Sequence, residues 1–256
     1  MTGAVTLDAL LGIPDIAPGD DLAETLAPVI ARTGGLLPRD ILVVAHKIVS
    51  KAEGNVVHLD QVNPSPEARR LAAELSKDPA KVQVVLDQSR RVVRAFKRPN
   101  QDEGTLICEH RLGYISANAG VDASNTDPGT LITLPDDPDA SAQRLAHGLR
   151  QRLGIAPGVV IADTFGRPWR LGQVNVAIGL YSVPAKTSEI GATDAWGRPL
   201  SVTEPALCDE LAAASGLVMA KAAKTPVVRI RGVKWTPQTD ARAGDILRQA
   251  KEDMFR

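Results

Sequence analysis

The feature that most constrains the fold is an alternation of short, wholly apolar runs with longer segments of helical periodicity. Ile41 to Ala45 and Val159 to Ala162 are short apolar runs rich in β-branched residues, which predict buried strands. Apolar residues recur at helical spacing over 22–30 and again from 136 to 153, where Gly154 ends the pattern. Strands that alternate with helices are typical of α/β or α+β proteins. The sequence therefore predicts a mixed α/β fold.

The remaining segments continue this alternation. Further helices are predicted to begin at Ser65 and at Asp78, the latter ending near Ser89, and to cover 203–215 and 240–255; further strands are predicted at 91–97, 105–108, 113–117, 173–183 and 227–230. A chain of 256 residues fits one large domain or two small ones. We interpret residues 1–256 as one domain, in which the Gly/Pro-rich segment 184–199 is the candidate crossing between two lobes.

Composition excludes several classes of function. Lys and Arg total 30, and Asp and Glu total 30, so the accumulated positive charge that holds nucleic acid or an anionic membrane surface is absent. The only cysteines, Cys108 and Cys208, suggest neither a disulfide framework nor a structural zinc site, and a reducing compartment is the simplest interpretation. No signal-peptide pattern opens the sequence, and no apolar run reaches about 18 residues. We expect a cytoplasmic protein with small-molecule partners.

The first polar cluster follows the strand predicted at 41–45. It runs from His46 to Gly54 and carries Lys47, Ser50 and Lys51. The carboxyl ends of strands are where α/β proteins place ligand-binding groups. Lysine charge and a serine hydroxyl can hold phosphate oxygens at such a position. The alternative is a solvated turn between a strand and a helix.

A second cluster, Ser116 to Asn125, packs small residues around Asp122 and Asn125. Small residues permit close approach of the backbone to a ligand. The same residue types also form Asx turns, and the sequence does not decide between the two interpretations.

The third cluster places Asp163 and Thr164 after the strand predicted at 159–162, followed by Arg167 and Arg170. Carboxylate and hydroxyl oxygens suit a hard cation such as Mg²⁺, and arginines can clamp carboxylates or phosphates. A capped turn with exposed arginines is the alternative. If the fold brings Asp122 and Asp163 together, the two carboxylates could share one metal ion.

Taken in order, these stretches resemble the coenzyme F-420-0:γ-glutamyl ligase family over nearly the whole chain. The stretches that carry the resemblance are Gly12-Ile13-Pro14, Gly19-Asp20-Asp21-Leu22, Lys47 to Gly54, Asn118 to Asn125, Asp163 to Arg167, and Gly172 to Gly179. Each is modest alone, but the set is specific in this order and spacing. Some members of the family are fused to a flavin-reductase domain, so the chain is expected to be a stand-alone ligase or the ligase domain of such a fusion.

The resemblance implies a two-lobed ligase fold, an intertwined homodimer and an activity. The family joins L-glutamate to the terminal carboxylate of coenzyme F-420-0, with hydrolysis of GTP, and then adds further γ-linked glutamates. Phosphorylation of the carboxylate to an acyl phosphate would allow attack by the glutamate amine. Mg²⁺ or Mn²⁺ is the implied divalent metal, with K⁺ as a monovalent cation.

The resemblance also implies roles for individual residues. Asp122, Asp163 and Thr164 occupy positions of metal ligands, and Lys51 and Arg167 join the two aspartates as expected catalytic residues. The expected nucleotide contacts are Ile13, Pro14, Asp15, Ile16, His46, Lys47, Ser50, Lys51, Asn125, Met219, Ala220, Lys221, Ala222, Ala223 and Lys224.

The chain departs from the family at Lys221, which stands where an acidic or amide metal ligand is expected. A protonated lysine cannot ligate Mg²⁺. We therefore hypothesise that the charge of Lys221 substitutes for that of a second metal ion. Normal nucleotide binding, metal binding and turnover in a Lys221→Glu variant would contradict this hypothesis.

Two alternatives to the F-420 ligase remain open from the sequence. One is a divergent amino-acid ligase with another acceptor or another nucleotide. The other is a nucleotide- or deazaflavin-binding protein without catalysis, which the altered loop around Lys221 favours. The presence of both Asp122 and Asp163 argues against a simple binder, because binding alone does not require two metal-ligating carboxylates.

Overall fold

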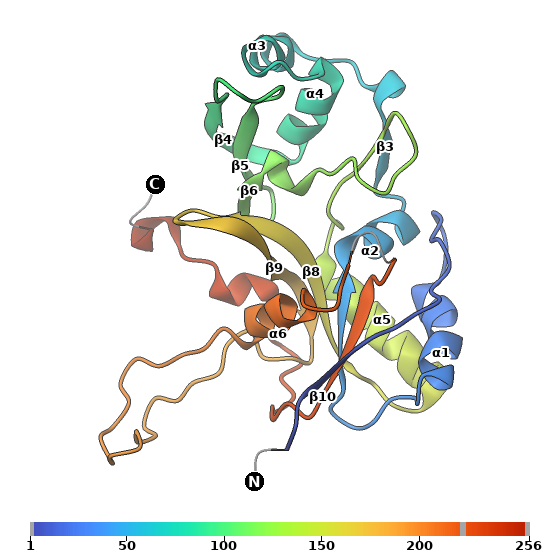
Figure 1. Cartoon of the computed structure of the whole chain (residues 1–256), viewed down its shortest axis with the longest axis vertical. Helices are drawn as coiled ribbons and strands as arrows, with labels where there is room; N and C mark the ends of the chain where they lie inside the picture. Colours follow the sequence, from blue (N-terminus) through green and yellow to red (C-terminus); the bar gives the residue numbers. More distant parts are fainter. Residues whose placement is uncertain (1–2, 221–223, 254–256) are drawn as a thin grey trace.

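The structure is a computed structural model that describes residues 3–220 and 224–253. Its centre is a five-stranded sheet in the order β1-β10-β2-β8-β9 (Figure 1). The strands are β1 (Thr6–Ala9), β2 (Ile41–Ala45), β8 (Gly158–Arg167), β9 (Arg170–Tyr181) and β10 (Val227–Arg231). β2 and β8 run parallel, and the other neighbouring strands pair antiparallel. The predicted mixed α/β class is therefore confirmed.

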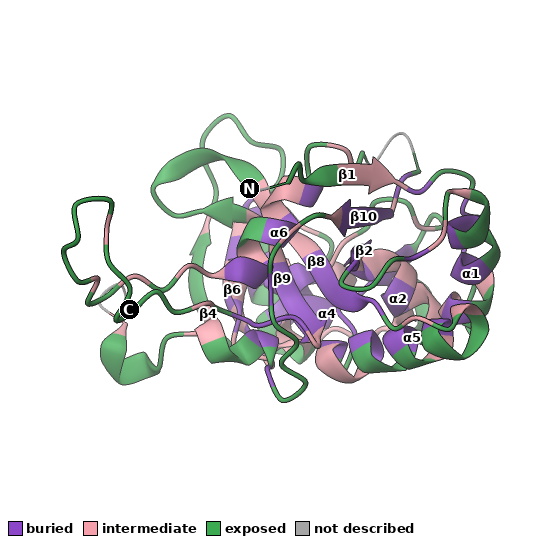
Figure 2. Cartoon of the chain, turned by 90° about the horizontal axis from the view of Figure 1, so that it is seen from below, coloured by how far each residue is buried: buried purple, intermediate pink, exposed green. Residues whose placement is uncertain are grey.

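Both faces of this sheet are buried, which explains the uninterrupted apolar runs in β2 and β8. Leu42 and Val44 point into a core formed with α1 (Leu22–Arg32) and α5 (Pro138–Leu153). Ile41 and Val43 point into the opposite core, which α6 (Leu207–Ser215) covers. Figure 2 shows the buried strands between helices whose outer surfaces are exposed.

A second group of elements has its own core. The three-stranded sheet β4-β5-β6 consists of β4 (Ser89–Phe96), β5 (Thr105–His110) and β6 (Ile115–Ala117). It packs with α3 (Pro66–Leu75) and α4 (Pro79–Asp87) around a separate hydrophobic cluster that includes Leu71, Val82 and Leu106. In Figure 1 this group lies beyond the β8–β9 ribbon, away from β1 and β10.

Short elements join the two groups. α2 (His46–Ala52) follows β2 directly, and β3 (Val56–His58) pairs with β7 (Thr130–Ile132). The 3₁₀ turns are η1 (Leu59–Gln61), η2 (Asn118–Gly120), η3 (Ala243–Ile246) and η4 (Ala250–Glu252). In the described part of the chain, no helix is long and apolar enough to cross a membrane.

Most of the segment predicted as a crossing, 184–199, lies instead in an exposed arm, while Ala185 near its start is buried in the core that α6 covers. The arm, residues 186–204, leaves after β9 and returns to α6, so both of its ends belong to the five-stranded sheet and its helix (Figure 1). Its two sides are joined by backbone hydrogen bonds, including Glu189 N to Thr203 O at 3.0 Å and Leu200 N to Ala192 O at 2.8 Å. The arm therefore does not connect the five-stranded sheet with the group formed by β4, β5 and β6.

Two predicted helices differ in the structure. The helix predicted over 240–255 is wrong for its described part, which contains only the 3₁₀ turns η3 and η4. There the buried Ala241 and Ala243 fill the α6 side of the sheet, and Ala243 N donates to Asp139 Oδ1 at 3.2 Å. The helix predicted over 203–215 begins only at Leu207, after Pro205.

Candidate functional site

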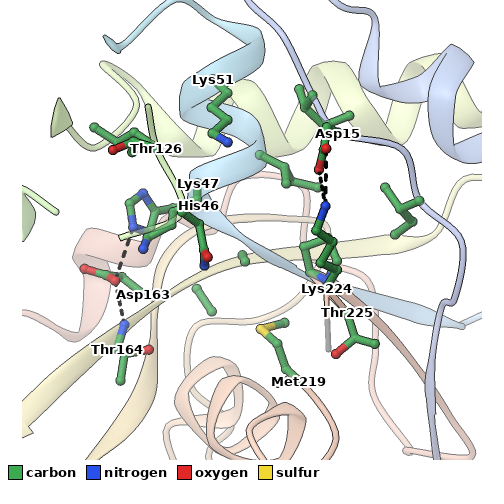
Figure 3. Close-up of a pocket in the computed structure, with 18 of the residues that line it drawn as sticks. Asp15, His46, Lys47, Lys51, Thr126, Asp163, Thr164, Met219, Lys224 and Thr225 are labelled. Carbon is green, nitrogen blue, oxygen red and sulfur yellow. Dashed lines mark hydrogen bonds and ion pairs between the residues drawn. The ribbon is translucent and has the colours of Figure 1, made fainter. Parts of the chain in front are cut away.

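A cavity of about 1220 Å³, the main cavity, opens beside α2 and the carboxyl end of β2 (Figure 3). Its walls come from the turn at 13–18, from α2, from β8 and β9, and from residues within 125–132, 213–220 and 224–226. These segments are far apart in sequence. The five-stranded sheet and its connections bring them together.

α2 presents its basic residues to this cavity. β2 ends at Ala45, and the helix that follows places Lys47 and Lys51 four residues apart, on one face. Both lysines line the main cavity (Figure 3). On another face Ser50 is fully buried and lies 3.2 Å from Nδ1 of His46. The cluster predicted after residue 45 therefore forms a short helix with cations aimed at a cavity.

Each of the two carboxylates predicted to bind metal has a basic partner on α2. Nε2 of His46 lies 3.3 Å from Oδ1 of Asp163, a close contact without hydrogen-bond geometry. Nζ of Lys47 lies 2.7 Å from Oδ2 of Asp122. Burial opposes ionisation of Asp122, but hydrogen bonds from Lys47 and from the Ser124 amide keep the pKa of its carboxyl below the usual value.

Thr164 and Asn175 continue the polar contacts of Asp163, and we call these three residues the polar centre. Thr164 Oγ1 donates to Asn175 Oδ1 at 2.9 Å, and Thr164 N donates to Asp163 Oδ1 at 2.6 Å. β8 continues to Arg167 and pairs with β9, so Asp163 and Thr164 lie within the strand and not after its end, as the sequence suggested. Thr164 pairs directly with Asn175 in this ribbon.

The oxygen atoms of Asp163 and Thr164 suit a hard cation that takes most of its ligands from substrate phosphates and water. Asp163 and Thr164 offer oxygen donors, the type that Mg²⁺ and Mn²⁺ prefer. The described residues contain no group of three or more His, Cys, Asp or Glu able to hold a metal. Mg²⁺ commonly binds through one or two carboxylates together with substrate phosphates and water. Asp122 could join such a site only if Lys47 moved from it.

The opposite rim of the main cavity carries an ion pair. Nζ of Lys224 lies 3.1 Å from Oδ1 of Asp15, which joins the N-terminal turn to the segment before β10 (Figure 3). Thr225 Oγ1 accepts a hydrogen bond from Ala220 N at 2.9 Å. The predicted contacts Lys221, Ala222 and Ala223 lie outside the described residues.

Most of the predicted site residues that the structure describes line the main cavity. They are Ile13, Pro14, Asp15, Ile16, His46, Lys47, Lys51, Asn125, Asp163, Thr164, Met219, Ala220 and Lys224. Three others lie elsewhere. Ser50 lies on the buried face of α2. Asp122 lines a neighbouring cavity. Arg167 is exposed, lines neither cavity and donates to the carbonyl of Leu171.

Several lining residues were not predicted. Thr126, Gln173, Asn175 and Thr225 all line the main cavity. Gln173 and Asn175 lie inside a stretch already recognised as characteristic, and their alternation along β9 was the available signal, because residues two apart on a strand share a face.

The neighbouring cavity, here called the side cavity, encloses about 290 Å³. Asp163, Thr164 and Gln173 line both cavities. The two spaces therefore meet at the polar centre on β8 and β9.

Comparison with known proteins identifies the family of the chain. The chain matches the family model described as F420-0:Gamma-glutamyl ligase over residues 11–232. A coenzyme F420:L-glutamate ligase of Methanopyrus kandleri is 44% identical over 247 residues, covering 94% of this chain and 93% of the relative. Ligases of the same name are 39% identical in Methanothermobacter thermautotrophicus, over 98% of this chain and 99% of the relative, and 40% identical in Methanocaldococcus jannaschii, over 85% and 84%. The chain thus belongs to the F420-0:γ-glutamyl ligase family.

Proposed function

We propose that the protein is a cytoplasmic ligase that joins L-glutamate to coenzyme F-420-0 in coenzyme F-420 biosynthesis, with GTP as the phosphoryl donor. The observation that carries the proposal is the meeting of two cavities at Asp163 and Thr164, beside the basic face of α2. The acceptor and the amino acid follow from the names of the relatives. The choice of GTP rests on the family resemblance.

The chemistry requires an activated carboxylate, because a carboxylate does not react with an amine unaided. In the proposed first step, an oxygen of the F-420-0 carboxylate attacks the γ-phosphorus of GTP, and GDP leaves. In the second step, the glutamate nitrogen bonds to the acyl carbon while the carbon–oxygen bond to phosphate breaks. Phosphate leaves with the electron pair, and the proton lost by the amine passes to water.

The main cavity has room for the nucleotide and the end of the acceptor. Its volume of about 1220 Å³ exceeds the roughly 300–1,000 Å³ typical of a pocket for one small ligand. Lys47 and Lys51 would lie against the phosphates, where their charges offset the charge that develops during phosphoryl transfer. The turn at 13–18 and the Asp15–Lys224 pair would close over the nucleoside.

Asp163 and Thr164 would hold the divalent ion, Mg²⁺ or Mn²⁺, with phosphate oxygens and water completing its ligands. When bound, such an ion supplies positive charge to the phosphate oxygens and orients them. Asn175 would fix the Thr164 hydroxyl, with which it already shares a hydrogen bond of 2.9 Å. K⁺ remains a further proposed cation without assigned ligands.

The family resemblance implies an intertwined homodimer, and we propose that the arm forms the contact between its subunits. The arm extends away from both hydrophobic cores and exposes Ile190, Trp196 and Val202. A reducing compartment agrees with the buried free thiols of Cys108 and Cys208.

The direct test is an incubation followed by mass spectrometry. Purified protein would be mixed with F-420-0, L-glutamate, and Mg²⁺ or Mn²⁺, with GTP or ATP in parallel. We expect nucleotide-dependent addition of glutamyl residues, with GTP preferred. No mass change with either nucleotide, from folded protein that still binds GTP, would contradict the proposal and favour a binding protein or another acceptor.

A further inference from the structure

The side cavity lies between the β8–β9 ribbon of the five-stranded sheet and the group of elements around β5. Its walls come from α4 and the turn before it, from β6 and the segment between β6 and β7, and from the β8–β9 ribbon. At about 290 Å³ it lies just below the range of roughly 300–1,000 Å³ typical for drug-sized ligands, so its size suits a small molecule and not a deazaflavin.

Two residues that line this cavity each carry a buried polar atom that lacks a hydrogen-bond partner within the described part of the protein. The atoms are Oγ of Ser116, a residue with only 7% of its surface exposed, and Oδ1 of Asn118. An unsatisfied buried polar group destabilises the folded protein. Rotation of either side chain toward the cavity would give its polar atom a partner on a bound polar ligand.

Charge is distributed unevenly around the cavity. Lys77 and Lys81 come from the side of α4, where both pair with Glu103, at 2.9 Å and 3.9 Å. The Lys77 side chain is only 11% exposed. Asp163, by contrast, lies on the β8 wall that borders the main cavity, and the cavity is also lined by Asp122, which pairs with Lys47. The cavity therefore has a basic side with one net positive charge and an acidic side toward the proposed reaction centre.

We propose that the side cavity binds the amino-acid substrate, L-glutamate, with its carboxylates toward Lys77 and Lys81 and its ammonium group toward Asp163. Ser116 and Asn118 would accept or exchange hydrogen bonds with the bound amino acid. The inference rests on the proposed function, and it adds that nucleotide and amino acid enter by separate cavities that meet at Asp163 and Thr164. The amine then reaches the activated carboxylate from the side away from the nucleoside.

The test compares three variants that alter the side cavity, Lys81→Met, Lys77→Met and Ser116→Ala. Lys97→Met is the matched control, because Lys97 belongs to the same group of elements, donates to Ser76 Oγ at 2.6 Å and lines neither cavity. For each protein, the KM values for L-glutamate, F-420-0 and GTP would be measured. Saturation-transfer NMR with L-glutamate alone would report binding without turnover.

We expect the two lysine variants to raise the glutamate KM by about tenfold or more, since a hydrogen bond to a charged group contributes about 1.5–3 kcal/mol. They should also weaken the preference for L-glutamate over L-glutamine, which lacks the side-chain carboxylate. The KM for GTP should stay unchanged in all variants. Ser116→Ala should raise the glutamate KM while leaving thermal stability equal or higher, because it removes an unpartnered buried hydroxyl.

The outcomes separate this inference from the proposed function. Ligation with an unchanged glutamate KM in folded Lys81→Met and Ser116→Ala would overturn the subsite and leave the ligase intact. Binding of L-glutamate that these variants weaken, in a protein that does not ligate F-420-0, would support the subsite and overturn the proposed function. Absence of both ligation and glutamate binding in the wild type would overturn both.

Discussion

Asp163 lies where both cavities meet, and its carboxylate is central to the proposed chemistry. Asp163→Asn keeps the size of the side chain and removes its charge. We expect the initial rate of glutamate addition to fall by about 100-fold or more, the loss typical when an electrostatic group at a reaction centre is removed. The measurement is product formation by mass spectrometry, with thermal unfolding as the control for folding. A variant that retains most of the wild-type rate would contradict the role.

How well single site residues could be predicted depended on their distance along the chain from an obvious motif. Asp163 and Lys51 follow apolar runs of the sequence, which made them visible there. Asn175 joins the site because β9 folds back along β8, and no local pattern encodes that pairing. Arg167 was assigned to the predicted site partly because the strand was expected to end at Ala162. The strand instead continues to Arg167, which is exposed.

His110 makes folding stability depend on pH. It is fully buried on β5, and burial, aided by Arg111 and Arg90, lowers the pKa of its imidazole to about 4. A pKa that is depressed in the folded state means that protonation favours the unfolded chain. Stability is thus fully present above about pH 6.5 and is lost as the pH falls toward 4, by up to about 3 kcal/mol from this residue.

The check is the free energy of unfolding in urea at pH 7.5 and 4.5, for wild type and His110→Gln. Asp139 and Asp209 have raised carboxyl pKa values, mainly from burial, and contribute with the opposite sign. They are common to both proteins, so the difference between the two pH dependences isolates His110. An equal loss of stability at low pH in both proteins would show that His110 does not cause it.

At the scale of elements, the contact between β9 and the start of α5 is among the tightest in the molecule. A Cβ at Gly179 would lie 2.4 Å from Cβ of Pro138. Here Asp139 Oδ1 also accepts from Leu180 N at 2.7 Å, which fixes the helix against the strand. We expect Gly179→Ala to lower the free energy of unfolding by about 1–3 kcal/mol, as overpacking does.

The control for this substitution is Gly244→Ala, where a new Cβ meets nothing within 4 Å. Urea unfolding of both variants against wild type measures the effect. A Gly179→Ala protein as stable as the Gly244→Ala protein would show that β9 and α5 can separate without cost.

Helix starts were predictable from their capping residues. Asp21 accepts from the amides of Ala23 and Glu24, Ser65 from Ala68 and Asp78 from Ala80, each at the predicted beginning of a helix. The helix predicted over 240–255 was wrong for its described part because Ala241 and Ala243 pack against the sheet, and these tertiary contacts outweigh the local helical periodicity. Neither β3 nor β7 was predicted, because three-residue strands carry too few alternations to show a pattern.

At the scale of the whole molecule, the mixed α/β class followed from the order of elements, but their arrangement did not. β1 pairs with β10, which lies more than 200 residues later in the chain, and this pairing completes the sheet. The junction of the two cavities likewise depends on how the group around β5 sits against β8 and β9. Such contacts arise from packing between distant segments, which periodicity and capping do not report.

The exposed side chains of the arm allow a direct test of whether two copies of the protein associate. Trp196 is 86% exposed, Val202 84% and Ile190 54%, although the backbone of the arm is hydrogen-bonded. Exposed apolar residues gathered on one projection mark an interaction surface. If this surface joins two copies, the wild type should sediment as a dimer, and Trp196→Asp combined with Ile190→Asp should sediment as a monomer. Analytical ultracentrifugation over a range of concentrations measures both.

Leu37→Asp is the control, because Leu37 is exposed, at 49%, in the loop before β2 and outside the arm. It should leave the dimer intact. The arm contributes no described residue of 186–204 to either main core, so the double variant should keep the circular dichroism spectrum of the wild type. A wild type that stays monomeric at every concentration, or a double variant that stays dimeric, would show that the arm serves something other than self-association.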